Sequence, residues 1–208
     1  MQTAQRSTAR HKLLLAAVDV VRAQGYAATS IDDLCLAAGV TKGAFFHHFK
    51  SKEDLAVAAA GYWAESTGEL FAAAPYHALP DPVARLLGYI DFRSAILVRG
   101  LPAFTCLAGT MVQETYGSHP AIRDACARAI ISHAAKVESD IEAAIAMRGI
   151  VPPWTAASLA LHMQAVLQGA FILAKATGEV ATAAACLAHL RRYVEMLFPA
   201  LASEEKTP

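Results

Sequence analysis

Residues 38–55, which read AGVTKGAFFHHFKSKEDL, gather side chains that suit an anionic partner. The segment holds three lysines, two adjacent histidines and three phenylalanines in eighteen positions. Lysine binds phosphate oxygens, and lysine or histidine can reach the hydrogen-bonding edges of bases in the major groove of DNA. The small residues between them would let the backbone approach DNA closely. The segment therefore predicts a DNA contact made by Thr41, Lys42, Gly43, Ala44, His47 and His48.

The charge of the chain is unevenly divided. Its 208 residues carry 18 Lys and Arg against 18 Asp and Glu, so the formal net charge is zero. Residues 1–50 nevertheless hold six basic residues and three acids, and the remaining residues are acidic by the same margin. A basic head on an acidic body indicates an anionic partner for the head alone. Near the start of the chain, a basic arm on the DNA backbone or minor groove is expected from Arg6, Arg10 and Lys12.

Two short helices must position the predicted contact. Ser30, with Asp33 three residues later, has the spacing of a capping box and opens a helix over 31–38. Residues 39–41 begin with a glycine that suits a sharp turn, and they separate this helix from a second one over 42–48. Two helices joined by such a turn form a helix-turn-helix, whose second helix enters the major groove.

Each of these features also has a plainer interpretation. A glycine between two short helices occurs in many helical proteins, and a pair of exposed histidines can simply be solvated. Neighbours on a helix point about 100° apart, so His47 and His48 do not suit a shared metal ion. We expect no metal site and no cofactor, and the helix-turn-helix is the better interpretation.

The rest of the sequence predicts helices only. Apolar residues make up 55% of the chain, alanine is abundant, and strand-like alternation is missing. Further helices are expected over 8–24, 51–74, 82–99, 103–116, 120–148, 155–176 and 181–198. Polar residues such as His162 and Gln164 interrupt the apolar stretch 156–174, which favours a buried interface helix over a membrane span. The chain is thus predicted to be an all-α protein of about nine helices.

The segment 29–55 resembles the N-terminal domain of the TetR family of bacterial transcriptional regulators. That domain carries a threonine before the helix-turn-helix, then A-G-V-S-K-G, an aromatic pair ending in H-F or Y-F, and S-K-E-x-L. The matching residues are Thr29, Gly39, Val40, Thr41, Lys42, Gly43, Phe49, Ser51, Lys52, Glu53 and Leu55. The resemblance implies a three-helix DNA-binding domain over 1–55 and a helical effector-binding and dimerisation domain over 56–208.

The helix-turn-helix geometry also places Lys52 near phosphates, and the resemblance adds Thr29 and Phe46 to the expected DNA-binding residues. Phe46 stands where the family usually has tyrosine, whose hydroxyl commonly touches a phosphate. We therefore expect His48 to carry more of that contact. Cys35 replaces the commoner alanine, and we interpret this as a packing difference.

The acidic body agrees with the family in architecture. TetR-like proteins hold a ligand in this domain and form a dimer through its last two helices. The penultimate helix carries an i, i+4 row with small residues that allow close helix crossing, namely Leu161, Ala165, Gly169 and Leu173. The last helix carries an apolar stripe that can equally be internal core, namely Leu187, Leu190, Val194 and Leu197. With the family, we expect a four-helix dimer interface.

The effector site is expected among the large or polar residues of the central helices. The candidates are Tyr62, Trp63, Tyr89, Phe92, Phe104, Met111, His162 and Met163. The apolar bias of this set suggests a small hydrophobic effector. Aromatic residues at helical spacing are also common in cores, so packing is the alternative role for the same residues.

The four cysteines are scattered without paired spacing, which argues against a disulfide framework and favours a reducing, cytoplasmic location. Cys106 lies in LPAFTCLAGTMVQE, which is similar to a segment of some TetR-like regulators whose cysteine responds to electrophiles or oxidants. The sequence places no basic residue beside Cys106, which favours a packed structural cysteine over a sensing thiol.

Together these features predict a homodimeric, DNA-binding transcriptional regulator, a ligand- or electrophile-responsive repressor that reads a pseudo-palindromic operator. A helical ligand-binding or thiol-sensing protein without DNA binding is the alternative. An enzyme is not expected, because we find no Ser-His-Asp or Cys-His arrangement at a useful spacing and no glycine-rich phosphate loop. The apolar run near the start is too short for a signal peptide, so we expect neither export nor membrane association.

Overall fold

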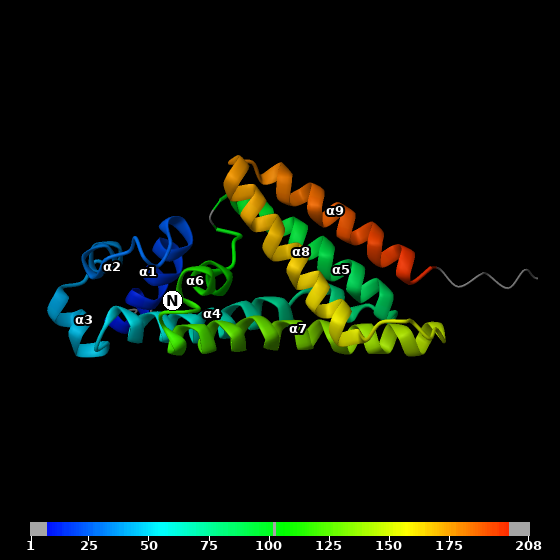
Figure 1. Ribbon diagram of the computed structural model, residues 1–208, viewed down its shortest axis with the longest axis horizontal. Helices are drawn as coiled ribbons and strands as arrows, with labels where there is room; N and C mark the ends of the chain where they lie inside the picture. The colour runs from blue at the N-terminus through cyan, green and yellow to red at the C-terminus, as the bar shows by residue number, and fades with distance from the viewer. Residues whose placement is uncertain (1–7, 102, 200–208) are drawn as a thin grey trace, which may run out of the picture. The chain divides into compact units, whose positions relative to one another are not determined.

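The computed structural model describes residues 8–101 and 103–199 and confirms the all-α prediction (Figure 1). Within these residues the chain forms nine α-helices and no strand. The α-helices are α1 (Ala9–Gln24), α2 (Ile31–Ala38), α3 (Lys42–His48), α4 (Lys52–Ala72), α5 (Pro82–Ala95), α6 (Leu107–Thr115), α7 (Pro120–Arg148), α8 (Ala156–Thr177) and α9 (Val180–Leu197). Two 3₁₀ helices, η1 (Pro75–Ala78) and η2 (Ile96–Arg99), flank α5.

Local sequence signals explain where most helices begin. Ser30 and Asp33 form both hydrogen bonds of the expected capping box at the start of α2. The backbone hydrogen bond from Ser30 lowers the pKa of the Asp33 carboxyl. Asp81 caps α5 by accepting the Val83 N–H, and Pro82 occupies the first turn as expected.

Two helix ends differ from the sequence expectation. The segment expected to be helical from residue 103 turns instead, since the Ala103 N–H donates to the Gly100 carbonyl at 2.9 Å. Helix α6 begins only at Leu107, and the Cys106 sulfur is its N-cap, accepting the Gly109 N–H at 3.3 Å. The helix expected over 82–99 is α-helical only as far as Ala95, and its last four residues form the tighter 3₁₀ helix η2.

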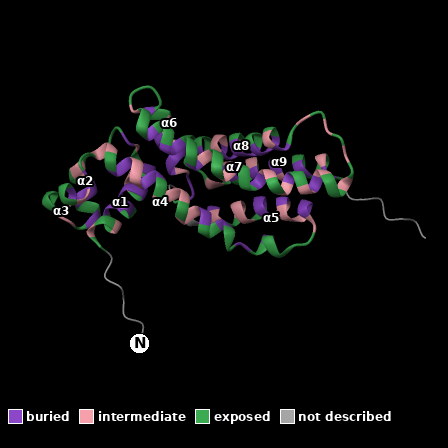
Figure 2. Ribbon diagram, turned by 90° about the horizontal axis from the view of Figure 1, so that it is seen from below, coloured by how far each residue is buried: buried purple, intermediate pink, exposed green. Residues whose placement is uncertain are grey.

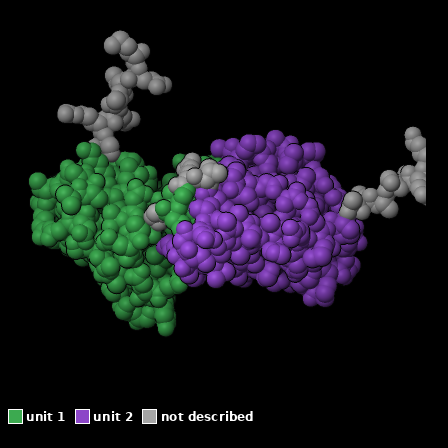
Figure 3. All heavy atoms as spheres, turned by 90° about the horizontal axis from the view of Figure 1, so that it is seen from above, with its two compact units in different colours: residues 1–71, 99–133 green, residues 72–98, 134–208 purple. Residues whose placement is uncertain are grey.

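The chain packs as two compact units (Figure 3). Unit 1 comprises residues 1–71 and 99–133, and unit 2 comprises residues 72–98 and 134–208. Helix α7 therefore contributes its first half to unit 1 and its second half to unit 2. Residue 55, where the sequence suggests a division of function, lies in the first turn of α4 within unit 1. That division stays a prediction about function.

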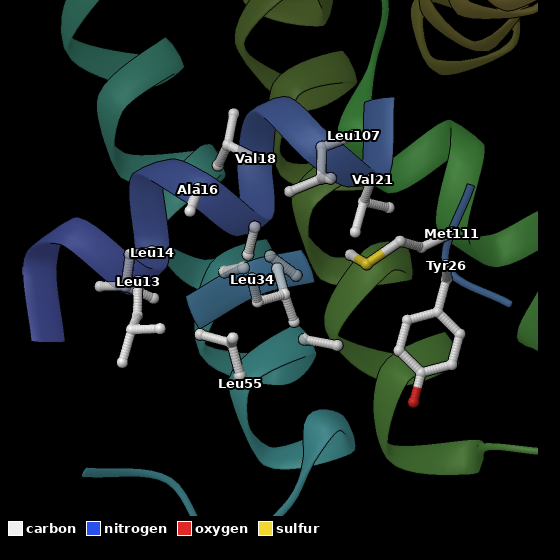
Figure 4. Packing of buried hydrophobic residues seen from close by; sticks show 14 of the residues in the cluster. Leu13, Leu14, Ala16, Val18, Val21, Tyr26, Leu34, Leu55, Leu107 and Met111 are labelled. Atoms are coloured by element: carbon white, nitrogen blue, oxygen red, sulfur yellow. The ribbon is translucent and has the colours of Figure 1, made fainter. Parts of the chain in front are cut away.

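The core of unit 1 joins the helix-turn-helix to α4, α6 and the first half of α7. Figure 4 shows side chains of α1, α2, α4 and α6 in one apolar cluster. Leu34, Phe45, Leu55 and Met111 each expose 1% of their surface or less. Burying a side chain of this size contributes about 1.5–3 kcal/mol, so these residues fix the short helices that could not persist alone.

The core of unit 2 lies among α5, α8 and α9, with α9 packed along both of the other helices. Leu187, Leu190 and Val194 of the apolar stripe on α9 are buried in this core. They are therefore internal packing residues. For these three residues the stripe on α9 is internal core, which was the alternative to a dimer interface. By contrast, Leu161 and Leu173 of the row on α8 are each about half exposed, at 48% and 50%.

Among the described residues, α8 is the one helix that is long and apolar enough to cross a membrane. Only 44% of its most apolar window is buried. Core helices of soluble proteins pass the same test, so this is weak evidence for a span. Buried Gln164 interrupts the apolar surface of α8, and the helix packs along α9.

Candidate DNA interface

The turn between α2 and α3 reverses the chain within three residues. Gly39 adopts φ 62°, a left-handed conformation that only glycine adopts without strain. Its N–H donates to the Leu36 carbonyl at 3.2 Å, and the Val40 N–H donates to the Cys35 carbonyl at 3.0 Å. These two bonds satisfy the last carbonyls of α2, so the helix ends cleanly and α3 can start at once.

Helix α3 is held to the core by one side only. The Thr41 hydroxyl caps it by accepting the Ala44 N–H at 3.1 Å. Phe45 is fully buried, and its ring centroid lies 6.0 Å from that of Phe49, which is also buried. The Phe46 ring meets Phe45 edge-on at 5.2 Å. These contacts fix the rotation of α3 about its axis and decide which residues face solvent.

Most of α3 is drawn as exposed in Figure 2, and this helix with its N-cap carries seven of the residues that the sequence assigns to DNA. Thr41, Lys42, Gly43, Phe46 and His47 are exposed, while Ala44 and His48 are half-buried. The two histidine rings pack edge to face, with centroids 4.8 Å apart. The structure therefore brings seven of the nine expected residues to one accessible surface, which we call the α3 face.

The other two expected residues, Thr29 and Lys52, form hydrogen bonds within the protein. Thr29 exposes 1% of its surface, and its hydroxyl donates to the Gly25 carbonyl at 2.6 Å. The Lys52 ammonium donates to the carbonyls of Tyr26 at 3.0 Å and Thr29 at 2.9 Å, and lies 4.2 Å from the centre of the Tyr26 ring. Burial lowers the pKa of Lys52. Both side chains hold the loop between α1 and α2.

Glu114 of α6, the last residue of the segment LPAFTCLAGTMVQE, holds the same loop, a role that the sequence motif did not predict. Its carboxylate accepts the N–H groups of Tyr26 at 3.2 Å and Ala27 at 2.7 Å. A side chain on Gly25 would collide with this carboxylate. Glu114 and the loop are nearly ninety residues apart in the chain, so only the fold reveals the contact.

Arg22 is a second residue that the sequence interpretation missed. It is 7% exposed, pairs with Asp19 at 2.8 Å, and donates to the Ala103 carbonyl just before α6. Its guanidinium carbon lies 4.9 Å from the Trp63 ring centre. The signal was present in principle, because Arg22 is four residues from Val18 on the apolar side of α1.

Lys42 on the α3 face has an acidic partner on α2. Its ammonium lies 2.8 Å from the Asp32 carboxylate, and both side chains are more than half exposed. The hydrogen bond to Asp32 raises the pKa of Lys42. From the sequence, Asp32 was counted only as one of the acidic charges of the head. The acidic residue of the capping box of α2 is Asp33, so the position of Asp32 in the helix gave no hint of its pairing with Lys42.

The expected basic arm is only partly within the described residues. Arg10 and Lys12 lie in α1 and are exposed, whereas Arg6 lies outside the described residues. The Arg10 guanidinium carbon is 5.6 Å from the Phe49 ring centre, at the end of α3. This contact places one positive charge of α1 beside the α3 helix.

The expected effector residues are divided between the two units. Unit 1 contains Tyr62, Trp63, Phe104 and Met111, and unit 2 contains Tyr89, Phe92, His162 and Met163. Met111 and Met163 are fully buried, whereas His162 is exposed and its ring packs on Tyr193 at 5.3 Å. In unit 2 the Tyr89 hydroxyl accepts hydrogen bonds from Arg93 at 3.1 Å and from buried Gln164 at 3.4 Å. Gln164 was not among the expected residues.

The four thiols are free and differ in burial. Cys126 is fully buried, and burial raises its pKa to about 12. Burial also raises the pKa of Cys35. Cys106 and Cys186 are half-buried. Within the described part of the chain, no three His, Cys, Asp or Glu side chains come together in a way that could hold a metal ion.

Comparison with known families identifies the fold around this interface. The pattern described as "Bacterial regulatory proteins, tetR family" matches residues 13–59, which contain the helix-turn-helix. The pattern described as "Tetracyclin repressor-like, C-terminal domain" matches residues 82–190, more than half of the chain. The chain belongs to the TetR family. Regulators of this family bind operator DNA and act as dimers.

Individual TetR-family relatives are distant. The chain is 35% identical over 54 residues to the HTH-type transcriptional regulator YerO of Bacillus subtilis, which covers 26% of this chain and 19% of that protein. It is 28% identical over 108 residues to the transcriptional regulator AcuR of Cereibacter sphaeroides. This match covers 52% of this chain and 49% of AcuR. Both matches span less than half of the relative's length. The crystal structure of a TetR regulator from Chloroflexus aurantiacus is 27% identical with a TM-score of 0.78, covering 89% of this chain and 93% of that one.

Proposed function

We propose that this TetR-family protein is a cytoplasmic, dimeric repressor that binds a pseudo-palindromic operator through the α3 face. The observation that carries the proposal is that α3 is buried on one side and exposed on the other. Buried Phe45 fixes the helix on its inner side, while Gly43, Lys42 and His47 lie exposed on its outer side. Lys42 and His47 would reach base edges, and Thr41 and His48 would contact phosphates.

For Thr29 and Lys52 we propose a supporting role in place of a direct DNA contact. The Lys52 ammonium already binds two carbonyls, and the Thr29 hydroxyl binds a third. A phosphate contact would require either side chain to give up these hydrogen bonds. Their contribution to DNA binding is to fix the loop that leads into α2.

The dimer would form through α8 and α9, on the surface that one chain leaves uncovered. The row on α8 contributes half-exposed Leu161 and Leu173 around Ala165 and Gly169. On α9 the available apolar residues are Tyr193 and Met196, at 36% and 72% exposure. Since Leu187, Leu190 and Val194 are buried in one chain, the partner would meet the opposite side of α9.

The α3 face can be tested at Gly43. A Cβ added there would meet nothing nearer than the Thr41 hydroxyl at 3.7 Å, so the protein has room for a side chain. Leucine at this exposed helical position is expected to keep or raise the free energy of unfolding, by up to about 1 kcal/mol. It would hold the backbone away from DNA and weaken binding by about 30-fold or more, which corresponds to roughly 2 kcal/mol.

The measurement is fluorescence anisotropy with a duplex that the wild-type protein selects from a random-sequence library. Gly61→Leu is the matched control, because Gly61 is also an exposed helical glycine with nothing within 4 Å of an added Cβ. It lies on α4 and should bind the duplex like the wild type. Equal affinities of Gly43→Leu and the wild type would show that α3 does not enter the groove.

We further propose that the repressor responds to an effector, with a small hydrophobic ligand or an electrophile as the two candidate classes. Of the thiols, Cys106 suits the second class best. It is half-buried, and its sulfur caps α6, the helix whose Glu114 holds the loop before α2. An adduct on the sulfur would break this cap and disturb a helix that contacts the DNA-binding head.

Mild treatment with N-ethylmaleimide should therefore label Cys106 before Cys126, whose thiol is fully buried. Peptide mass spectrometry gives the order of labelling, and anisotropy on the same sample gives the affinity for the selected duplex. We expect affinity to fall in step with the label on Cys106, and Cys106→Ser to be resistant. Labelling that leaves affinity unchanged would assign Cys106 to packing alone.

A further inference from the structure

The ion pair between Lys42 and Asp32 is the feature of the α3 face that DNA binding leaves unexplained. The ammonium and carboxylate are 2.8 Å apart, with side chains 60% and 69% exposed. An acidic group in this place opposes the attraction of the helix for DNA. Yet Lys42 is the only lysine or arginine within α3, so the pair neutralises the principal positive charge of the helix.

Asp32 is not needed to start α2. The cap of that helix is complete without it, because Ser30 accepts the Asp33 N–H at 3.1 Å and Asp33 accepts the Ser30 N–H at 2.8 Å. Asp32 sits beside this box in the first turn, and its carboxylate points to the ammonium on α3. The residue that faces the DNA-binding helix is thus free of a capping role.

We propose that Asp32 is a specificity-determining residue, which holds the Lys42 ammonium and thereby prevents it from binding phosphates indiscriminately. This inference rests on the proposed function, since it requires the α3 face to meet DNA. On a random sequence Lys42 stays paired with Asp32 and contributes little. On the operator, the Lys42 ammonium, which has three donors, donates to the O6 or N7 atom of a guanine while it keeps its hydrogen bond to Asp32. A phosphate cannot share the ammonium in this way, because the Asp32 carboxylate repels its negative charge.

The physical reason lies in how nonspecific affinity arises. Binding to any duplex is driven by cations that meet phosphates and release counterions, and each such contact changes the slope of log K against log salt by about 0.9. A lysine that keeps its own carboxylate releases no counterion on binding. The pair therefore lowers affinity for the many wrong sites while leaving the directional contact to the right base available.

The test is Asp32→Asn, measured on a random-sequence duplex and on the duplex selected by the wild type, over a series of salt concentrations. We expect the random duplex to bind about 3- to 10-fold more tightly and its salt slope to steepen by about 0.9, the value for one phosphate contact. Affinity for the selected duplex should change less than threefold. The ratio of the two affinities, which defines specificity, would therefore fall.

Asp124→Asn is the matched control. Asp124 lies on α7 in unit 1, pairs with Arg123 at 2.8 Å, and is about half exposed, so its replacement changes the net charge equally. It should leave both affinities and both slopes unchanged. In a second comparison, the double variant Asp32→Asn with Lys42→Gln has the wild-type net charge and no lysine to release at position 42. It should bind the random duplex like the wild type.

The outcomes separate this inference from the proposed function. A wild-type protein that binds neither duplex would refute the α3 face as a DNA interface. Binding that Asp32→Asn leaves unaltered would overturn the role of Asp32 alone. A gain that persists without Lys42, or that is equal on both duplexes, would also overturn it, because either result means only that a negative charge has been removed near DNA.

Discussion

Replacing Leu173 by arginine is expected to leave the protein monomeric and to weaken its binding to a two-half-site operator by about 100-fold or more. Leu173 is 50% exposed on α8 and lies in the row with Leu161, Ala165 and Gly169. In the proposed four-helix interface this row faces a second chain, and an arginine there would be buried without a carboxylate partner, which is strongly unfavourable. The loss in DNA affinity follows because two linked heads bind far more tightly than one.

Met147→Arg is the control for this experiment. Met147 is 51% exposed and lies on α7 in unit 2, so the new charge enters at a similar exposure outside α8 and α9. Light scattering after size exclusion should give a dimer for the wild type and Met147→Arg, and a monomer for Leu173→Arg. A dimeric Leu173→Arg protein would place the subunit contact elsewhere.

The sequence predicted local structure well because the signals act over a few residues. The capping box at Ser30 and the helix start at Pro82 depend on neighbours in the chain, and both form as expected. Helix α6 was placed too early because the turn at Gly100 and the cap by Cys106 compete with helical continuation. Cysteine is a rare N-cap residue, so the sequence around residue 106 did not predict a helix start there.

Contacts between distant segments could not be predicted in the same way. The carboxylate of Glu114 and the loop at Tyr26 meet only because α6 packs on α1. The apolar stripe on α9 indicated that one side of the helix is buried. It did not indicate whether the same chain or a partner chain buries it. Periodicity reports burial and does not distinguish the same chain from a partner, so Leu187 and Leu190 were assigned to core only by the fold.

The candidate site shows the same division. Motif residues such as Thr41 and Lys42 were correctly expected at the surface, because a short helix with one buried aromatic has a defined outer side. The engagement of Lys52 by two carbonyls was hidden, since a lysine at the start of a helix looks exposed in sequence. The Asp32 partner of Lys42 was hidden as well, because the two residues lie on different helices.

Phe45→Ala is the second substitution with a large expected effect, and it acts on stability first. Phe45 is fully buried and is the only buried residue of α3. Removing its ring should lower the free energy of unfolding by about 3–5 kcal/mol, the usual cost of a buried Phe to Ala change. Helix α3 has seven residues, too few to persist without packing, so binding to the selected duplex should be lost as well.

Phe46→Ala separates the two effects because it makes the same substitution at the next residue. Phe46 is 55% exposed and loses only its edge-on contact with Phe45, so its replacement should lower the free energy of unfolding by about 1 kcal/mol, much less than Phe45→Ala. Any loss of affinity in this variant then reports a contact with DNA. Urea titration followed by circular dichroism measures the first quantity, and anisotropy measures the second. If Phe45→Ala unfolds at the same urea concentration as Phe46→Ala, then Phe45 does not anchor α3, and the orientation that exposes Lys42 and His47 to DNA has another cause.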